Sequence, residues 1–325
     1  SSIYSIYQYI LNKKYIDKLI NDIKELEIRD IHLFGGGEPF FYKENMFYFL
    51  ENLKDTDIFI RIITNANNLN NRDVDYIVKN KLVSSLNISF NTDCEEAAKK
   101  LYADSSRHAH SLSILETIAK CRELYSTNFP KINIMSTLLN TNYNKISDII
   151  QRIGRYKIDF FSLQPLRCYS DNQKEFMLTK SQEESFEEDI LRIEERLNDF
   201  KISSNISELR KESKVDSRNS LLSGSQGRLE LKNKNNLDLK CYVPLITLAI
   251  SYNGGIPFCF FKYDKQYEHN YFELNSLKEF IRSREYVAFI NSLADQRLPE
   301  VCTGCQFCSF HEFGIIKERF MSFRG

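Results

Sequence analysis

The sequence of 325 residues has no tryptophan, no excess charge of either sign and no long apolar run. Lysine and arginine together number 44, as do aspartate and glutamate, so we expect neither a nucleic acid nor an anionic membrane as a partner. No apolar stretch approaches the roughly 20 residues of a membrane-spanning helix, and the N-terminus does not resemble a signal peptide. We therefore expect a soluble, cytoplasmic protein. The missing tryptophan, beside abundant asparagine, isoleucine and lysine, is more typical of an AT-rich genome than of any chemistry.

Segments with helical and strand-like patterns alternate through the first half of the chain. Apolar residues at helical spacing are followed by short β-branched runs, and this unit recurs. Such alternation predicts an α/β fold with right-handed βα units and a parallel sheet, either open or curled into a barrel. The predicted helices are residues 15–28, 44–53, 72–80, 111–125 and 144–156, and the predicted strands are residues 30–34, 58–65, 83–91, 131–140 and 158–166.

Each of the five predicted strands ends in polar or glycine residues. The endings read GGGEP, TNANN, SFNTD, NTNYN and QPLR. Because the carboxyl ends of parallel strands meet at one edge of a sheet and carry the site in such folds, we expect these endings to converge. The first ending, residues 35–39, is not typical of a phosphate-binding loop, since no helix N-terminus with a correctly spaced lysine or glycine follows it.

The pattern changes after Arg167. Residues 181–200 are predicted to form one helix, with Ser181 and Glu184 as a capping box. Residues 201–240 are polar and have few apolar anchors, so we interpret them as a linker or a lid. Residues 241–325 are rich in cysteine around one helix at about residues 276–293 and are interpreted as a second, small α+β domain. The predicted domains are therefore residues 1–200, 201–240 and 241–325.

Five of the eight cysteines lie in the last 85 residues. Closely spaced thiolates in a cytoplasmic protein indicate a metal site rather than disulfides, and four sulfur ligands suit either Zn²⁺ or an iron–sulfur cluster. The spacing alone leaves both open. Of the other three, Cys121 lies on an apolar helix stripe and is expected to be a small buried residue, whereas Cys94 and Cys168 lie near strand ends. The five candidate ligands are Cys241, Cys259, Cys302, Cys305 and Cys308.

The order of these motifs resembles the radical S-adenosylmethionine (SAM) superfamily. FGGGEPFF after one strand, IITNANNL after the next, LNISFN after the third and an asparagine-rich ending after the fourth are similar to the motifs of that superfamily over nearly all of residues 1–170. The pattern Cys241-x12-Gly254-x4-Cys259, followed by Cys302-x2-Cys305, resembles the twitch and SPASM auxiliary-cluster domains of the same superfamily. The resemblance implies a partial (β/α)6 TIM-like barrel and favours an auxiliary [4Fe–4S] cluster over zinc.

The resemblance also implies a set of SAM-binding residues. Gly36, Gly37 and Glu38 would receive the methionyl ammonium, which needs acceptors that glycine allows to approach closely. Arg107 stands where many members keep an arginine for the SAM carboxylate. Asn91 replaces the usual aspartate near the ribose. The remaining positions implied for the SAM pocket are Thr64 and Asn65 in IITNANNL, Ser89 near the ribose, Asn142 in the asparagine-rich ending and Leu166 beside the adenine.

The C-x3-C-x2-C motif that holds the radical SAM cluster is not in the sequence, which begins at Ser1 about where that loop would end. We expect the loop and the first barrel strand to precede Ser1. For the auxiliary cluster, the resemblance favours Cys241, Cys259, Cys302 and Cys305 as ligands, with Cys308 as an alternative. Since no cysteine follows Cys308, one auxiliary [4Fe–4S] cluster, as in a twitch-like domain, is expected.

The implied function is a radical SAM oxidoreductase or maturase. It would form a 5′-deoxyadenosyl radical and abstract hydrogen from a peptide or small-molecule substrate, and the auxiliary cluster would support a crosslink, a dehydrogenation or an epimerisation. A reductant such as flavodoxin or ferredoxin would be a partner. Two alternatives stay open: a catalytically degenerate SAM-binding partner protein and a zinc-stapled binding module. The catalytic residues and the substrate are not predicted.

Overall fold

The computed structural model describes residues 12–34, 37–102, 104, 106–166, 168, 171–207, 244, 247–251, 253–259, 269–294 and 302. The chain divides into two compact units. One comprises residues 28–227, and the other comprises residues 1–27 together with residues 228–325.

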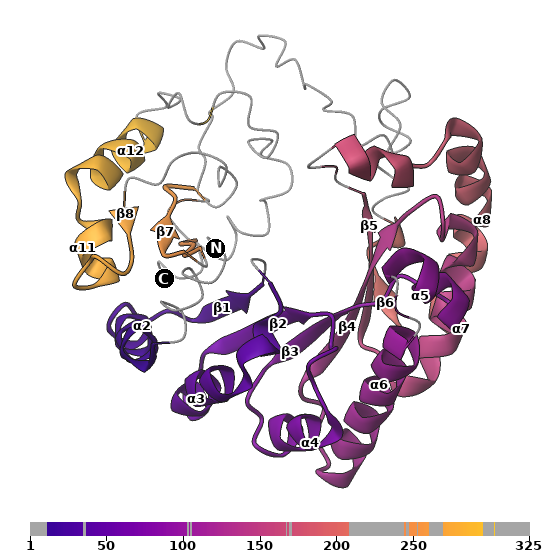
Figure 1. The fold of residues 1–325 in the computed structure, drawn as a ribbon, viewed down its shortest axis with the longest axis horizontal. Helices are drawn as coiled ribbons and strands as arrows, with labels where there is room; N and C mark the ends of the chain where they lie inside the picture. The colour runs from indigo at the N-terminus through magenta and orange to yellow at the C-terminus, as the bar shows by residue number, and fades with distance from the viewer. Residues whose placement is uncertain are drawn as a thin grey trace. The chain divides into compact units, whose positions relative to one another are not determined.

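The larger unit contains a curved sheet of six parallel strands in the order β1-β2-β3-β4-β5-β6 (Figure 1). Helices α3, α4, α6, α7 and α8 form a layer outside this sheet. The strands are β1 Asp30–Leu33, β2 Phe59–Thr64, β3 Ser85–Ser89, β4 Lys131–Leu138, β5 Phe160–Pro165 and β6 Ser203–Ser204, and the α-helices are α3 Lys43–Leu53, α4 Asn71–Lys79, α5 Glu95–Tyr102, α6 Ser106–Leu124, α7 Ile146–Ile153 and α8 Lys180–Asp199. Short 3₁₀ turns are η1 Pro39–Tyr42, η2 Tyr143–Lys145, η3 Gly154–Tyr156 and η4 Asp171–Phe176.

The core of this unit lies between the sheet and the helices. Alternate residues of β4 are buried, as the period of two predicts for a strand, and the intervening residues are partly exposed. Helix α7 contributes Ile149, Ile150 and Ile153, all fully buried, because its isoleucines recur at helical spacing. The six parallel strands with surrounding helices confirm the predicted partial TIM-like barrel.

Three features of this unit differ from the sequence prediction, and the first is helix α5, which was not predicted. The sixth strand, β6, was not predicted and pairs with β5 at the edge of the sheet, within the segment interpreted as a linker. Helix α8 begins at Lys180, and its capping box consists of Thr179 and Gln182. The prediction of Ser181 and Glu184 as this capping box was wrong, because Thr179 is the last extended residue and Ser181 already lies in the first turn.

The smaller unit combines helix α2, Lys13–Glu25, with the C-terminal elements. These are a two-stranded antiparallel sheet of β7, Gly255–Ile256, and β8, His269–Asn270, and helices α11, Leu277–Ile281, and α12, Arg284–Ala294. The Tyr271 hydroxyl donates to the buried carboxylate of Asp22 at 2.8 Å, and the Lys18 ammonium donates to the Tyr271 carbonyl at 2.6 Å. Helix α2 therefore packs against elements far away in sequence.

The helix predicted at about residues 276–293 is two helices. Helix α11 ends at Ile281, and α12 begins at Arg284. The Ser283 main-chain N–H bonds the Phe280 carbonyl at 2.9 Å in the turn between them. The break lets Phe280 and Tyr286 pack together in one core cluster, with their ring centroids 4.7 Å apart.

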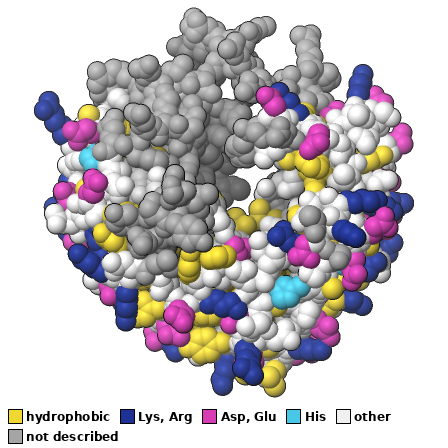
Figure 2. Space-filling view, viewed as in Figure 1, with side chains coloured by type: hydrophobic (Ala, Val, Ile, Leu, Met, Phe, Trp, Pro, Cys, Tyr) yellow, Lys and Arg dark blue, Asp and Glu magenta, His cyan; other side chains and the backbone are white. Residues whose placement is uncertain are grey.

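The described helices include none that is long and apolar enough to cross a membrane. Positive and negative side chains are interspersed over the described part of the face in Figure 2, in keeping with the equal numbers of acidic and basic residues.

Candidate functional site

The carboxyl end of β1 leads into the glycine run and Glu38. Gly35 and Gly36 lie outside the described residues. Gly37 has a φ of 140°, a conformation that residues with a Cβ rarely adopt, so glycine is required there. Glu38 begins the turn η1, and one of its carboxylate oxygens accepts from the Phe40 main-chain N–H at 3.4 Å. The glycine run thus delivers one carboxylate to this edge of the sheet.

Strand β2 ends beside that carboxylate. The Thr64 hydroxyl donates to Glu38 Oε1, and the Asn65 main-chain N–H donates to Glu38 Oε2 at 2.9 Å. Thr64 is only 2% exposed, and its hydroxyl oxygen also accepts from the Ala66 N–H at 2.9 Å. The structure therefore brings together three of the sequence-predicted residues, and both oxygens of Glu38 have a hydrogen-bond donor.

Asn142 joins the ends of β3 and β4. Its amide nitrogen donates to the carbonyls of Asn91 and Thr137, at 3.0 and 2.9 Å, and its amide oxygen accepts from the Leu139 N–H at 2.8 Å. The residue is 3% exposed. Because these main-chain bonds use both ends of the amide, its evident role in the described structure is to hold two strand ends together.

Asn91, at the end of β3, is linked to a residue that the sequence analysis missed. Its amide oxygen accepts from the Thr137 N–H at 2.7 Å, and its amide nitrogen donates to the Tyr102 hydroxyl at 2.8 Å. The Arg107 guanidinium lies over the ring of Tyr102, with Cζ 5.2 Å from the ring centroid. No motif distinguishes Tyr102 in the sequence, so only the fold connects it with Asn91 and Arg107.

Arg107 has a buried donor atom. Its Nε is enclosed and has no hydrogen-bond partner among the residues that the structure describes, and the Asp104 carboxylate lies 3.7 Å away. A buried donor without an acceptor is costly, so it fits a bound anionic group. Ser89 and Leu166, the other predicted positions, are half-buried at the ends of β3 and β5.

The chemistry of this edge suits a ligand with both an ammonium and a carboxylate. Glu38 supplies an acceptor for a cation, and Arg107 supplies a fork of donors for an anion. The C-terminal edge of parallel strands is also where α/β folds place their sites. The residues present therefore fit an amino-acid moiety such as that of SAM.

A second candidate site lies in the smaller unit. Cys259 and Cys302, far apart in sequence, are each 6% exposed and belong to one core cluster with Phe289 and Leu293. Cys241, Cys305 and Cys308 lie outside the described residues. Within the described part of the chain no group of three or more metal-binding side chains occurs. What the structure shows is that two of the five candidate thiols share one buried cluster.

The three remaining cysteines are not gathered. Cys121 is 7% exposed, as expected for a small buried residue, and its thiol also faces the Asp75 carboxylate at 3.7 Å. Burial, followed by the negative charge of Asp75, raises the pKa of the Cys121 thiol. Cys94 and Cys168 are partly buried.

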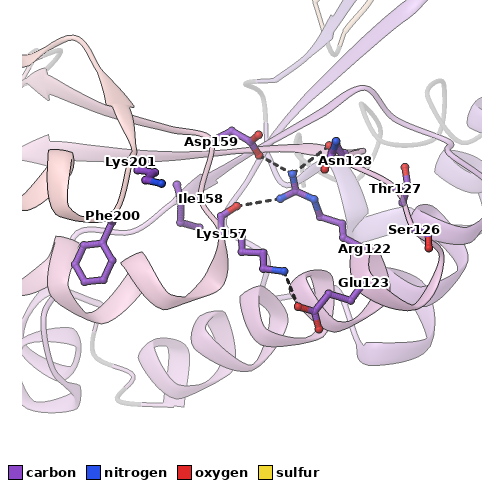
Figure 3. Close-up of a pocket in the computed structure, with 10 residues that line it drawn as sticks. All are labelled: Arg122, Glu123, Ser126, Thr127, Asn128, Lys157, Ile158, Asp159, Phe200 and Lys201. Carbon is purple, nitrogen blue, oxygen red and sulfur yellow. Dashed lines mark hydrogen bonds and ion pairs between the residues drawn. The ribbon is translucent and has the colours of Figure 1, made fainter.

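A cavity of about 440 Å³ lies at the opposite end of the strands (Figure 3). Arg122 lies in its wall and donates to the Asp159 carboxylate at 3.0 Å and to the carbonyls of Lys157 and Asn128, both at 3.1 Å. A second positive charge at this cavity, the Lys157 ammonium, is neutralised by an ion pair with Glu123. These charged groups of the cavity thus pair with one another, and the cavity lies at the amino ends of β4 and β5. We therefore interpret it as a structural feature, because the sites of such folds lie at the carboxyl ends of the strands.

Two family models match the chain. Residues 2–153 match the radical SAM superfamily, and residues 241–306 match the SPASM iron–sulfur cluster-binding domain. No curated protein matches in a sequence comparison.

Several solved structures are similar in fold. SuiB of Streptococcus suis bound to S-adenosylmethionine has 18% identity and a TM-score of 0.53 over 90% of this chain and 62% of SuiB. The enzyme anSMEcpe with bound AdoMet and Cp18Cys peptide has 14% identity and a TM-score of 0.54 over 91% of this chain and 80% of its own. SuiB bound to its precursor peptide SuiA has 18% identity and a TM-score of 0.52, and this chain spans 59% of it. At such identities the likeness concerns the fold.

Proposed function

Because the chain belongs to the radical SAM superfamily and carries a SPASM iron–sulfur cluster-binding domain, we propose that it is a SAM-cleaving enzyme that removes hydrogen from a peptide substrate. The cofactors of these domains are SAM, a [4Fe–4S] cluster and auxiliary iron–sulfur clusters. The observation that carries the proposal is the combination, at one edge of the sheet, of the fixed Glu38 carboxylate with the buried Nε of Arg107, which has no hydrogen-bond partner among the described residues.

The [4Fe–4S] cluster of a radical SAM domain would supply the electron for the reductive cleavage of SAM. The described residues would bind SAM and orient it. Glu38, held by Thr64 and Asn65, would accept the methionyl ammonium, and Arg107 would donate to the carboxylate. Fixing both ends of the methionyl group limits its motion relative to the sheet edge, which is how positioned polar groups contribute to catalysis.

A peptide is favoured over a small molecule because the similar structures SuiB and anSMEcpe contain bound peptides. The proposed outcome is an oxidative modification of a side chain, namely a crosslink, a dehydrogenation or an epimerisation, with a flavodoxin or ferredoxin as reductant. For the auxiliary cluster we propose Cys241, Cys259, Cys302 and Cys305 as ligands, with Cys308 as the alternative fourth. The shared core position of Cys259 and Cys302 supports this assignment.

The test is SAM cleavage by anaerobically reconstituted protein, produced with whatever sequence precedes Ser1 in its gene. We expect 5′-deoxyadenosine on reduction, and deuterium transfer into it from a deuterated peptide substrate. Glu38→Gln and Arg107→Lys should each lower SAM affinity by tenfold or more, on the order of the loss of a charge-assisted bond, whereas Arg155→Lys should not.

The alternatives give other results. Iron with SAM binding but no cleavage would indicate a degenerate partner protein. Zinc without iron would indicate a zinc-stapled module and would overturn the proposal. Deuterium transfer from a small molecule, and not from a peptide, would contradict the peptide assignment. The proposed cleavage of SAM would still hold in that case.

A further inference from the structure

The orientation of the Asn91 amide is determined by its neighbours. The Thr137 main-chain N–H lies 2.7 Å from Asn91 Oδ1. A main-chain N–H can only donate, so the amide oxygen must face Thr137 and the amide nitrogen must face the Tyr102 hydroxyl. The Asn142 amide braces the same strand end by donating to the Asn91 carbonyl at 3.0 Å.

This orientation determines what the Tyr102 hydroxyl does. An amide nitrogen can only donate, so the Tyr102 oxygen accepts the 2.8 Å bond and the hydroxyl hydrogen points to a different group. No acceptor for that hydrogen lies within hydrogen-bond distance among the residues that the structure describes. Burial raises the pKa of Tyr102 above its usual value near 10, so the phenol remains a donor at neutral pH.

A second donor group, the Arg107 guanidinium, is adjacent, and its Nε forms an ion pair with the Asp104 carboxylate at 3.7 Å. The Arg107 guanidinium lies over the Tyr102 ring, and its Nε is buried without a hydrogen-bond partner in the described part of the chain. One guanidinium and one hydroxyl donor beside each other match a group with two acceptor oxygens and a negative charge. A carboxylate has that chemistry, whereas an ammonium would repel the guanidinium.

From these contacts we propose that Tyr102 is a further SAM-binding residue, whose hydroxyl donates a hydrogen bond to the SAM carboxylate beside Arg107. This inference rests on the proposed function. It also gives Asn91 a specific role. An aspartate at position 91 would accept the Tyr102 hydrogen, whereas the asparagine amide donates to Tyr102 and leaves that hydrogen for the ligand.

The experiment measures the dissociation constant for SAM by calorimetry on the anaerobically reconstituted holoenzyme. Tyr102→Phe removes the hydroxyl and keeps the ring beneath Arg107, and it should weaken SAM binding about ten- to a hundredfold, the range for a bond to a charged group. Tyr125→Phe is the matched control, since its hydroxyl donates to Asp75 at 2.7 Å, away from the strand ends. Equal thermal melting of both variants and the parent protein shows that the fold is intact.

A double-mutant cycle tests the direction of the hydrogen bond. Asn91→Asp should weaken SAM binding in the Tyr102 background more than in the Tyr102→Phe background, because only the tyrosine has a hydrogen to divert. Equal losses in both backgrounds would reflect charge repulsion alone and would overturn the proposal. Unchanged affinity in Tyr102→Phe, with SAM bound by the parent protein, would overturn it and leave the proposed function intact. Failure of the parent holoenzyme to bind SAM would overturn both.

Discussion

The Thr64 hydroxyl donates a hydrogen bond to one carboxylate oxygen of Glu38, while the neighbouring Asn65 N–H donates to the other oxygen at 2.9 Å. The end of β2 thus orients the acidic residue that follows β1. Thr64→Val keeps the shape of the side chain and removes the hydroxyl. We expect SAM affinity to fall by about tenfold, since a bond to a charged acceptor is worth roughly 1.5–3 kcal/mol and the Asn65 contact remains. Calorimetry at constant pH measures the change.

The conservative variant separates orientation from packing. Thr64→Ser retains the hydroxyl and should recover most of the affinity, and Thr117→Val serves as a control because the Thr117 hydroxyl, on α6, donates to Asn71 and the Ser113 carbonyl and contacts none of the predicted SAM-binding residues. Unchanged affinity in Thr64→Val would show that the hydroxyl is not needed to orient Glu38, and weak binding in Thr64→Ser as well would show that the methyl group contributes in addition to the hydroxyl.

Asn142 is expected to contribute to the stability of the fold, in addition to its predicted place in the SAM pocket. Asn142→Ala leaves the Leu139 N–H and the carbonyls of Asn91 and Thr137 without their side-chain partner at a buried position. We expect a loss of about 2–4 kcal/mol in the free energy of unfolding in urea. Asn52→Ala, which removes one exposed bond on α3, should change stability by less than about 0.5 kcal/mol. A loss below about 1 kcal/mol for Asn142→Ala would contradict the bracing role.

The sequence predicted strands β1 to β5 because each is an apolar run with a local period, and a local period needs no knowledge of the fold. Strand β6 consists of two serines and has no such pattern. Its position depends on long-range contacts. Asn205 exchanges hydrogen bonds with the main chain of Leu163 at 2.9 and 2.8 Å, and the flanking Ile202 and Ile206 are buried. Periodicity cannot show contacts of this kind.

The candidate site, like the fold, could be predicted from the sequence only in part. The motif order was sufficient to predict that Glu38 and Thr64 would lie at one edge, because parallel strands bring their carboxyl ends together. It was not sufficient to predict which groups each side chain contacts. Tyr102 lies at the end of the unpredicted helix α5, so its contact with Asn91 depends on a helix that sequence periodicity did not indicate.

The cysteines of the smaller unit give a prediction about metal content. Cys259→Ser and Cys302→Ser should each lower the iron content by about four atoms per chain, the content of one [4Fe–4S] cluster, because both belong to the same core cluster. Cys121→Ala removes a buried thiol in the other unit and should leave iron unchanged. Iron and sulfide are measured after anaerobic reconstitution. A full iron content in either serine variant would exclude that cysteine as a required ligand.

His108 gives a prediction about pH. Its ring is 5% exposed and packs on Phe90, with centroids 5.2 Å apart, and Nδ1 lies 3.4 Å from the Thr92 hydroxyl. Its Nε2 is buried without a hydrogen-bond partner among the described residues. Burial, and then the positive charge of Arg152, lowers the pKa of His108 below 6.5, although Asp93 and Glu95 oppose the shift. The folded protein therefore binds the proton less readily than the unfolded chain.

The sign of the effect on stability follows from this difference. Between the lowered folded pKa and the unfolded value near 6.5, the unfolded state binds more protons, so stability rises with pH. The contribution is complete above about pH 6.5 and is lost as the pH falls through the folded pKa. Urea unfolding at a series of pH values from 7.5 down to 5.0 should show a smaller loss of stability for His108→Gln than for the parent protein, because glutamine cannot titrate. Parallel pH profiles for the two proteins would show that His108 is not the group responsible.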